Sequence, residues 1–122
     1  TLAITTALLV ACAHGLAVYY SLYWNYLWFD IPVHILGGLT FGFWAGAVSL
    51  RMRFSPLSAV LFIFATVFFV SVVWEVSEFI SGLTFLEKGF WEDTVSDIFF
   101  ALLGASLAYL FYILVRGRTK TQ

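Results

Sequence analysis

The side chains of this chain that could do chemistry are two histidines and a set of carboxylic acids within or beside long apolar segments. Imidazole nitrogens and carboxylate oxygens together suit zinc, iron or manganese, whereas copper is less favoured without more histidine or sulfur. Glu87 and Glu92 fall in a mixed polar stretch and are expected to be solvated loop charges. The remaining candidates are the predicted metal ligands His14, Asp30, His34, Glu75, Glu78, Asp93 and Asp97.

The spacing of these residues indicates shared helix faces. Residues three or four positions apart are neighbours on an α-helix. Three pairs have this spacing: Asp30 with His34, Glu75 with Glu78, and Asp93 with Asp97. At about 1.5 Å per residue, His14, His34, Glu75 and Asp97 would lie on the order of 6–12 Å below the ends of their helices. The sequence therefore predicts that four helices each offer a ligand at a similar level.

Composition identifies the solvent around these helices. Hydrophobic residues make up 62% of the 122 residues, charged residues 11%, and the mean hydropathy is +0.98. A soluble domain carries about 25% charged residues, so a surface this apolar predicts an integral membrane protein in a lipid bilayer. The net charge of −1 gives no indication of nucleic-acid binding.

Four segments are apolar enough and long enough to cross a bilayer, which takes roughly 20 helical residues. They span about 2–22, 31–50, 56–81 and 94–115. The first has no basic region and no clear cleavage motif, so we expect a membrane span rather than a signal peptide. Short connections favour an all-α, antiparallel four-helix bundle as one domain over residues 1–122. Ser55 and Asp93 are the expected N-caps of the third and fourth spans.

The basic residues predict the orientation. Arg51 and Arg53 separate the second and third spans, whereas Arg116, Arg118 and Lys120 follow the fourth. The opposite side carries only Lys88. The positive-inside rule therefore predicts a protein of the cytoplasmic (inner) membrane with both termini cytoplasmic and the acidic end facing outward.

Small residues continue the polar faces along the helices. Asp30 and His34 are followed at the same four-residue interval by Gly38, Gly42 and Gly46. In the fourth span, Gly104 lies beside alanines that continue the Asp93–Asp97 face. Small residues at this interval let helices approach closely in lipid. The polar faces are therefore expected to be packing faces that point into the bundle.

Clustered acids inside a membrane need compensation. A carboxylate at the centre of a span costs about 2.5–3.5 kcal/mol, and neighbouring carboxylates repel each other. A bound divalent cation would offset both costs, and the ligands suffice for either one or two metals. Proton sharing, or water in an outward-open cavity, would be alternatives. Four-helix bundles do host dinuclear carboxylate sites, although their Glu-x-x-His motif is absent from this chain.

Three motifs carry a resemblance to a known family: Phe29-Asp30 through Gly38, Trp74-Glu75-Val76-Ser77-Glu78, and Glu92-Asp93-Thr94-x-x-Asp97 through Ala101-Leu102-Leu103-Gly104-Ala105. With them the chain resembles the YjdF-like family of bacterial inner-membrane proteins. The resemblance covers about the second to fourth spans, and the known members are longer. It implies that these residues form one unit, and it implies no particular activity.

Three functions are compatible with these features. The leading hypothesis is a metal-binding membrane protein, extended to a metal-dependent enzyme at the outer leaflet in which a metal-bound water acts and a spare carboxylate is the general base. Hydrolysis of a membrane-embedded substrate and oxidation at a di-iron site both stay open. The second hypothesis is an accessory subunit of a larger membrane complex or a homo-oligomer. The third is a cation or proton pathway, although the inner halves of the predicted spans carry no charged residue.

Overall fold

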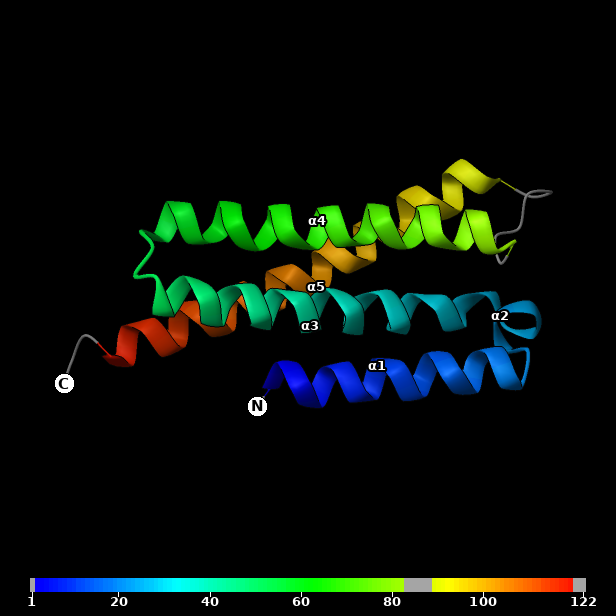
Figure 1. Cartoon of the computed structure of the whole chain (residues 1–122), viewed down its shortest axis with the longest axis horizontal. Helices are drawn as coiled ribbons and strands as arrows, with labels where there is room; N and C mark the ends of the chain where they lie inside the picture. Colours follow the sequence, from blue (N-terminus) through cyan, green and yellow to red (C-terminus); the bar gives the residue numbers. More distant parts are fainter. Residues whose placement is uncertain (1, 83–88, 120–122) are drawn as a thin grey trace.

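A computed structural model of the chain describes residues 2–82 and 89–119, and every regular element within these residues is helical. Four of the helices are long and apolar enough to cross a membrane, which confirms the predicted all-α membrane protein. The elements are α1 (Leu2–Tyr19), α2 (Leu22–Asn25), the 3-10 turn η1 (Leu27–Phe29), α3 (Asp30–Arg51), α4 (Pro56–Ser81) and α5 (Phe90–Thr119) (Figure 1).

The start of α4 agrees with its sequence signals. The hydroxyl of Ser55 accepts a hydrogen bond from the backbone N–H of Ser58 at 3.1 Å, and Pro56 occupies the first turn. Gly82 ends the helix in the left-handed conformation, with a φ of 68°. A side-chain acceptor at the start and a glycine just past the end satisfy helix termini in the usual way, so both ends of α4 are set locally.

The start of α5 differs from the prediction. The helix begins at Phe90, and the backbone N–H of Asp93 already bonds the carbonyl of Gly89 at 3.0 Å. Asp93 is therefore a first-turn residue and not the N-cap. Its negative charge is still favoured there, because unpaired backbone N–H groups give a helix start a partial positive charge. The first span is also shorter than expected, since α1 ends at Tyr19 and a separate α2 follows.

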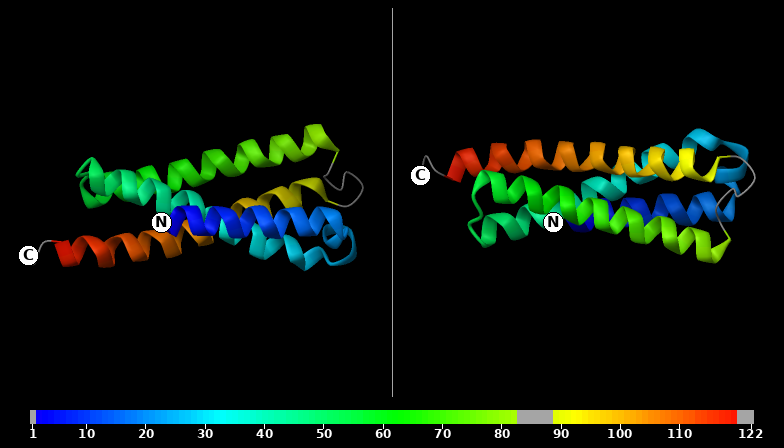
Figure 2. Two further views of the ribbon diagram at one scale, coloured as in Figure 1. Left: turned by 60° about the horizontal axis from the view of Figure 1, so that its bottom comes forward. Right: turned by 90° about the horizontal axis from the view of Figure 1, so that it is seen from above.

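Helix α3 is the central element of the bundle. The long helices α1, α3, α4 and α5 alternate in direction along the chain, as expected from the short connections (Figure 1). The most extensive packing, however, joins α3 to α5, which run in the same direction. Helix α3 also packs against α1 and α4, and α4 packs against α5 (Figure 2). Sequence proximity therefore does not determine the tightest interface.

Glycine and alanine residues make the contact between α3 and α5 close. A Cβ added at Gly38 would collide with the backbone carbonyl of Ala101, and one added at Gly104 would collide with the carbonyl of Ile35. A Cβ at Gly42 would lie 2.6 Å from the Cβ of Ala108. The two backbones thus touch over several turns, which is the arrangement that small residues permit in lipid.

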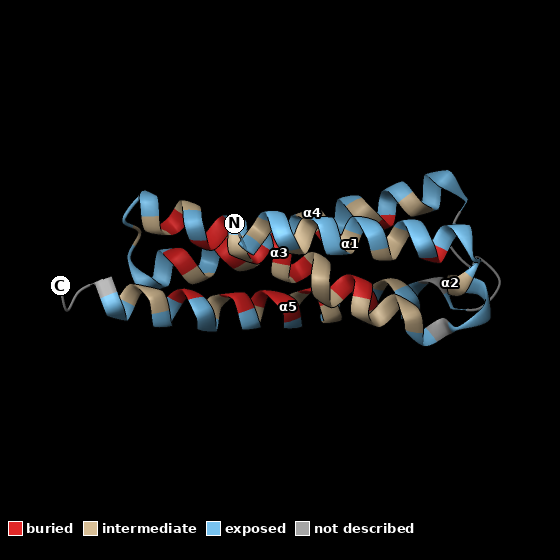
Figure 3. Ribbon diagram, turned by 90° about the horizontal axis from the view of Figure 1, so that it is seen from below, coloured by how far each residue is buried: buried red, intermediate tan, exposed pale blue. Residues whose placement is uncertain are grey.

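Burial follows the same interfaces. Buried residues lie mainly on the sides of the helices that face one another (Figure 3). Large apolar side chains such as Leu61, Phe69 and Leu114 are exposed. This exposed surface suits lipid rather than water. The core cluster consists of Ala45, Ala59, Ile63, Val67, Ala101, Ala105 and Tyr112.

The two ends of the bundle differ in charge. Arg51 and Arg53 lie where α3 meets α4, and the C-terminal end of α5, with Arg116 and Arg118, lies at the same end (Figure 1). Arg116 donates hydrogen bonds of 2.6 Å to the carbonyl of Phe54 and to the hydroxyl of Tyr112, which ties this turn to α5. Glu87, Lys88 and Lys120 lie outside the described residues.

Candidate functional site

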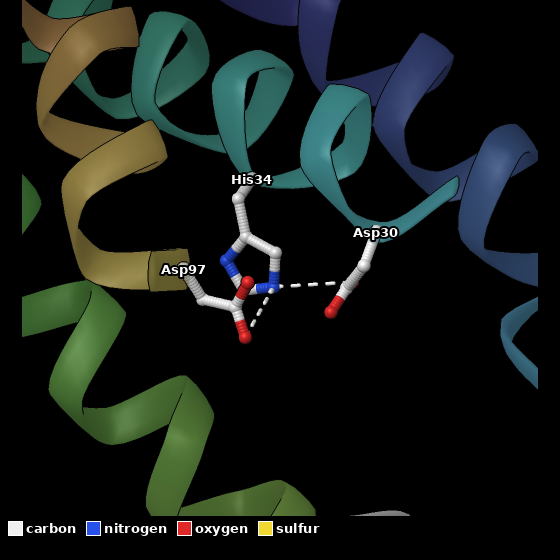
Figure 4. Close-up of side chains that lie close together, drawn as sticks. All are labelled: Asp30, His34 and Asp97. Atoms are coloured by element: carbon white, nitrogen blue, oxygen red, sulfur yellow. Dashed lines mark ion pairs between the residues drawn. The ribbon is translucent and has the colours of Figure 1, made fainter. Parts of the chain in front are cut away.

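His34 is the centre of a polar site at the end of the bundle that carries α2. Its Nε2 atom lies 3.2 Å from Oδ1 of Asp30, one turn earlier on α3, and 3.8 Å from Oδ2 of Asp97 on α5 (Figure 4). Both contacts are ion pairs when the imidazole is protonated. The predicted Asp30–His34 pair therefore does share a face, and that face points toward α5.

Helix α4 brings two further carboxylates to His34. One ligand atom each from His34, Glu75 and Glu78 lie within 4.8 Å of one another, as do one each from Asp30, His34 and Asp97. The two groups share His34. We refer to Asp30, His34, Glu75, Glu78 and Asp97 together as the carboxylate–histidine cluster; its members come from three helices.

The most enclosed members of the cluster are shielded by protein on all sides. The exposed fraction is 3% for Asp97, 4% for Glu75 and 6% for His34, whereas Asp30 and Glu78 are half-buried at the rim. Charged groups at such burial are found only when they are paired, hydrogen-bonded or bound to a cation. The cluster therefore needs compensation from within the protein or from a bound ion.

Hydrogen bonding within the described residues supplies only part of that compensation. Three buried polar atoms have no hydrogen-bond partner there: Nε2 of His34, Oε1 of Glu75 and Oδ2 of Asp97. They come from α3, α4 and α5, one from each helix. The Nε2 contacts with Asp30 and Asp97 are close in distance but do not meet hydrogen-bond geometry. Most buried polar side-chain atoms in proteins have a partner, so three such atoms at one place require an explanation.

Two residues that belong to the motifs of the sequence analysis, but not to the predicted ligands, hold the glutamates. Thr94 on α5 donates a 3.0 Å hydrogen bond to Oε2 of Glu75, and Trp74 donates a 2.8 Å bond through Nε1 to Oε1 of Glu78. The i,i+4 spacing of Trp74 and Glu78 is a signal that could have found the second contact. No local signal pairs Thr94 with Glu75, because they lie on different helices.

His14 lies beside the cluster in a different set of contacts. Its Nδ1 atom is 2.8 Å from the hydroxyl of Tyr23, and its ring packs edge-on against Trp74 with 5.1 Å between centroids. Burial, with smaller effects from the negative charges of Asp30 and Glu78, raises the pKa of the Tyr23 phenol above its ordinary value. The phenol therefore keeps its proton at neutral pH and can donate it to His14.

Neither three-residue group includes His14 or Asp93. Asp93 is exposed in the first turn of α5, one turn before Asp97. Helix α1 thus contributes an aromatic and hydrogen-bonding neighbour where the sequence predicts a ligand. The structure brings together Asp30, His34, Glu75, Glu78 and Asp97, and leaves the other two predicted ligands outside the cluster.

The spacing of the cluster is compatible with a metal ion. Nitrogen and oxygen ligands bind zinc at about 2.0–2.2 Å, so neighbouring ligands in a tetrahedral site are about 3.4 Å apart. The two contacts of His34, at 3.2 and 3.8 Å, lie on either side of that separation. The upper limit of 4.8 Å within each group requires only small side-chain adjustments to converge on one ion.

Comparison with known proteins gives a family. The family described as "Predicted membrane protein (DUF2238)" matches residues 1–118. The chain belongs to this family. The match includes the four helices that are long and apolar enough to cross a membrane and the whole cluster, so the site lies inside the matched region. No curated protein and no solved structure matches the chain.

Proposed function

We propose that this membrane protein binds a divalent transition metal through the carboxylate–histidine cluster. Three membrane-spanning helices contribute ligands, and the ligand set of one imidazole and four carboxylates suits zinc, iron or manganese. The side chains are sufficient for one ion, and with the two groups sharing His34 a dinuclear site is the fuller version of the same proposal.

One observation carries the proposal. Nε2 of His34, Oε1 of Glu75 and Oδ2 of Asp97 are buried and lack hydrogen-bond partners among the described residues. A cation held by Asp30, His34 and Asp97, or one held by His34, Glu75 and Glu78, would serve two of these three residues and would reduce the repulsion among the carboxylates. The dinuclear version of the site would serve all three. A proton shared between His34 and the acids would also reduce the repulsion, through the contacts of His34 with Asp30 and Asp97, so the metal content of the protein decides between the two.

Metal content of the purified protein tests the proposal. Protein extracted in mild detergent and freed of loosely bound ions should contain about one or two equivalents of zinc, iron or manganese by elemental analysis. Glu75→Gln and His34→Ala should each remove most of this metal, because each takes away a ligand that the remaining groups cannot replace.

An exposed acid provides the matched control. Asp93→Asn removes a carboxylate from the same end of α5, but Asp93 belongs to neither group, so its metal content should equal that of the wild-type protein. Wild-type protein without stoichiometric metal would contradict the proposal. Metal-free protein that purifies with larger subunits would instead support the accessory-subunit hypothesis, and ion flux in liposomes lost in Asp97→Asn would support a pathway.

We also propose that the cluster faces outward from the cytoplasmic membrane. The described arginines lie at the opposite end of the bundle from the cluster, and positive residues favour the cytoplasmic side. In a Cys12→Ser background, a membrane-impermeant maleimide should label Asn25→Cys but not Met52→Cys in right-side-out vesicles. The reverse pattern would overturn this orientation. The YjdF-like resemblance of the three motifs fits the same location.

A further inference from the structure

An apolar cavity of about 70 Å³ lies directly beside the cluster, on the side toward the middle of the membrane. Helices α1, α3, α4 and α5 all contribute to its walls. His34 belongs both to the cluster and to the cavity lining, so one imidazole borders the two sites. Its walls include His34, Gly37, Phe41, Val67, Val70 and Trp74.

Gly37 creates part of this space. A Cβ added at Gly37 would meet no atom within 4 Å, whereas one added at its neighbour Gly38 would collide with the backbone of Ala101. The two adjacent glycines therefore have different roles. Gly38 permits the close packing of α3 and α5, and Gly37 leaves open volume along the cavity wall.

The chemistry of the walls defines what the cavity can hold. Apart from His34 and Ser71, its lining residues are apolar. Apolar cavities stay dry and take apolar guests; one of roughly 150 Å³ binds benzene, so this smaller one accommodates a few methylene groups. Its wall reaches the surface, because Phe41 is 40% exposed, and the medium around these spans is lipid hydrocarbon.

We propose that this cavity binds a segment of a lipid acyl chain and holds it against the imidazole of His34. The acyl chain would enter the cavity from the surrounding bilayer, so no aqueous route is needed. With the proposed metal function, on which this step rests, the arrangement would place a membrane-embedded molecule with a hydrocarbon chain next to the metal ligand His34. Binding of the acyl chain depends only on the cavity and not on the metal.

Photolabelling tests the binding. The wild-type protein is reconstituted in phosphatidylcholine vesicles that contain a phospholipid with a diazirine on its acyl chain, and the labelled residues are mapped by mass spectrometry. We expect labelling within residues 33–41 and 67–74 above the level on lipid-facing residues such as Leu61 and Leu114. Gly37→Leu fills the cavity and should lower the cavity labelling about ten-fold.

Gly15→Leu is the matched control, because Gly15 also has no atom within 4 Å of an added Cβ but is not among the residues that line the cavity. It should keep wild-type cavity labelling. Gly37→Ala, a smaller change that preserves folding, should lower the labelling partially. Unchanged labelling in both Gly37 variants, an equal loss in Gly15→Leu, or wild-type labelling no higher than on lipid-facing residues would each overturn the inference.

Elemental analysis of the same samples separates this inference from the metal proposal. Gly37→Leu with normal metal content and lost labelling supports the chain-binding cavity beside an intact metal site. Wild-type protein that is labelled in the cavity but holds no metal would refute the proposed function and leave the lipid site standing. Metal-containing protein without cavity labelling would refute the lipid site and leave the proposed metal function standing.

Discussion

His34 and Asp97 face each other one helical turn before the point, along both chain segments, where α3 and α5 touch. The imidazole Nε2 lies 3.8 Å from Oδ2 of Asp97, and one turn farther along the two helices Gly38 contacts the backbone of Ala101. The glycine contact thus sets the separation of the two helices next to the site. The geometry of the cluster depends on a packing contact that has no chemistry of its own.

Gly38→Ala should therefore damage both the fold and the site. The added methyl group would meet backbone atoms of Ala101, which cannot move aside as a flexible side chain would. We expect a loss of about 1–3 kcal/mol in stability from overpacking and a lower metal content as His34 and Asp97 separate. Thermal unfolding and elemental analysis measure the two effects. Gly15→Ala, where an added Cβ meets nothing within 4 Å, should leave the metal content unchanged and should not lower stability.

Thr94→Val should weaken metal binding without removing a ligand. The hydroxyl of Thr94 orients Glu75 by donating a hydrogen bond to its Oε2 atom. Loss of a hydrogen bond that orients a metal ligand lowers metal affinity by about 10–100-fold. Titration with a competing chelator measures the affinity. Thr94→Ser keeps the hydroxyl and should restore most of it. If Thr94→Val binds metal as tightly as the wild-type protein, Glu75 does not depend on this hydrogen bond.

His14→Ala and His34→Ala should give different results. His14 is hydrogen-bonded to Tyr23 and lies outside both ligand groups, so its loss should leave the metal content unchanged. Stability should fall by about 0.5–1.5 kcal/mol, as expected for one hydrogen bond, and Tyr23→Phe should cause a similar loss. Complete loss of metal in His14→Ala would show that α1 supplies a ligand after all.

Arg116→Gln should reduce stability and leave the site intact. Its guanidinium donates to the carbonyl of Phe54 and to the hydroxyl of Tyr112 at the end of the bundle remote from the cluster. Hydrogen bonds from a charged donor contribute about 1.5–3 kcal/mol, so the unfolding midpoint should drop measurably while metal content stays constant. Arg51→Gln, at an exposed position of the same end, is the control and should have a smaller effect. Equal midpoints for the two variants would contradict the role of Arg116.

The sequence by itself determined the properties that depend on local order. Hydropathy predicted the four spans, because each must cover the hydrocarbon thickness with apolar residues. Helical periodicity put Asp30 and His34 on one face with Gly38, and the Ser55-Pro56 signal located the start of α4. These features are read within one segment, so no knowledge of the partner helix is needed.

Only the tertiary structure decided which faces meet. The tightest interface joins α3 to α5, which are not consecutive in the chain, and it brings Asp97 to His34. The packing of α4 against α5 brings Thr94 to Glu75. The tertiary arrangement also pairs His14 of α1 with Tyr23 of α2 and leaves open space at Gly37 beside His34. The rotation and crossing of each helix follow from the summed packing of side chains on different segments, and that sum cannot be read from the periodicity of any one of them.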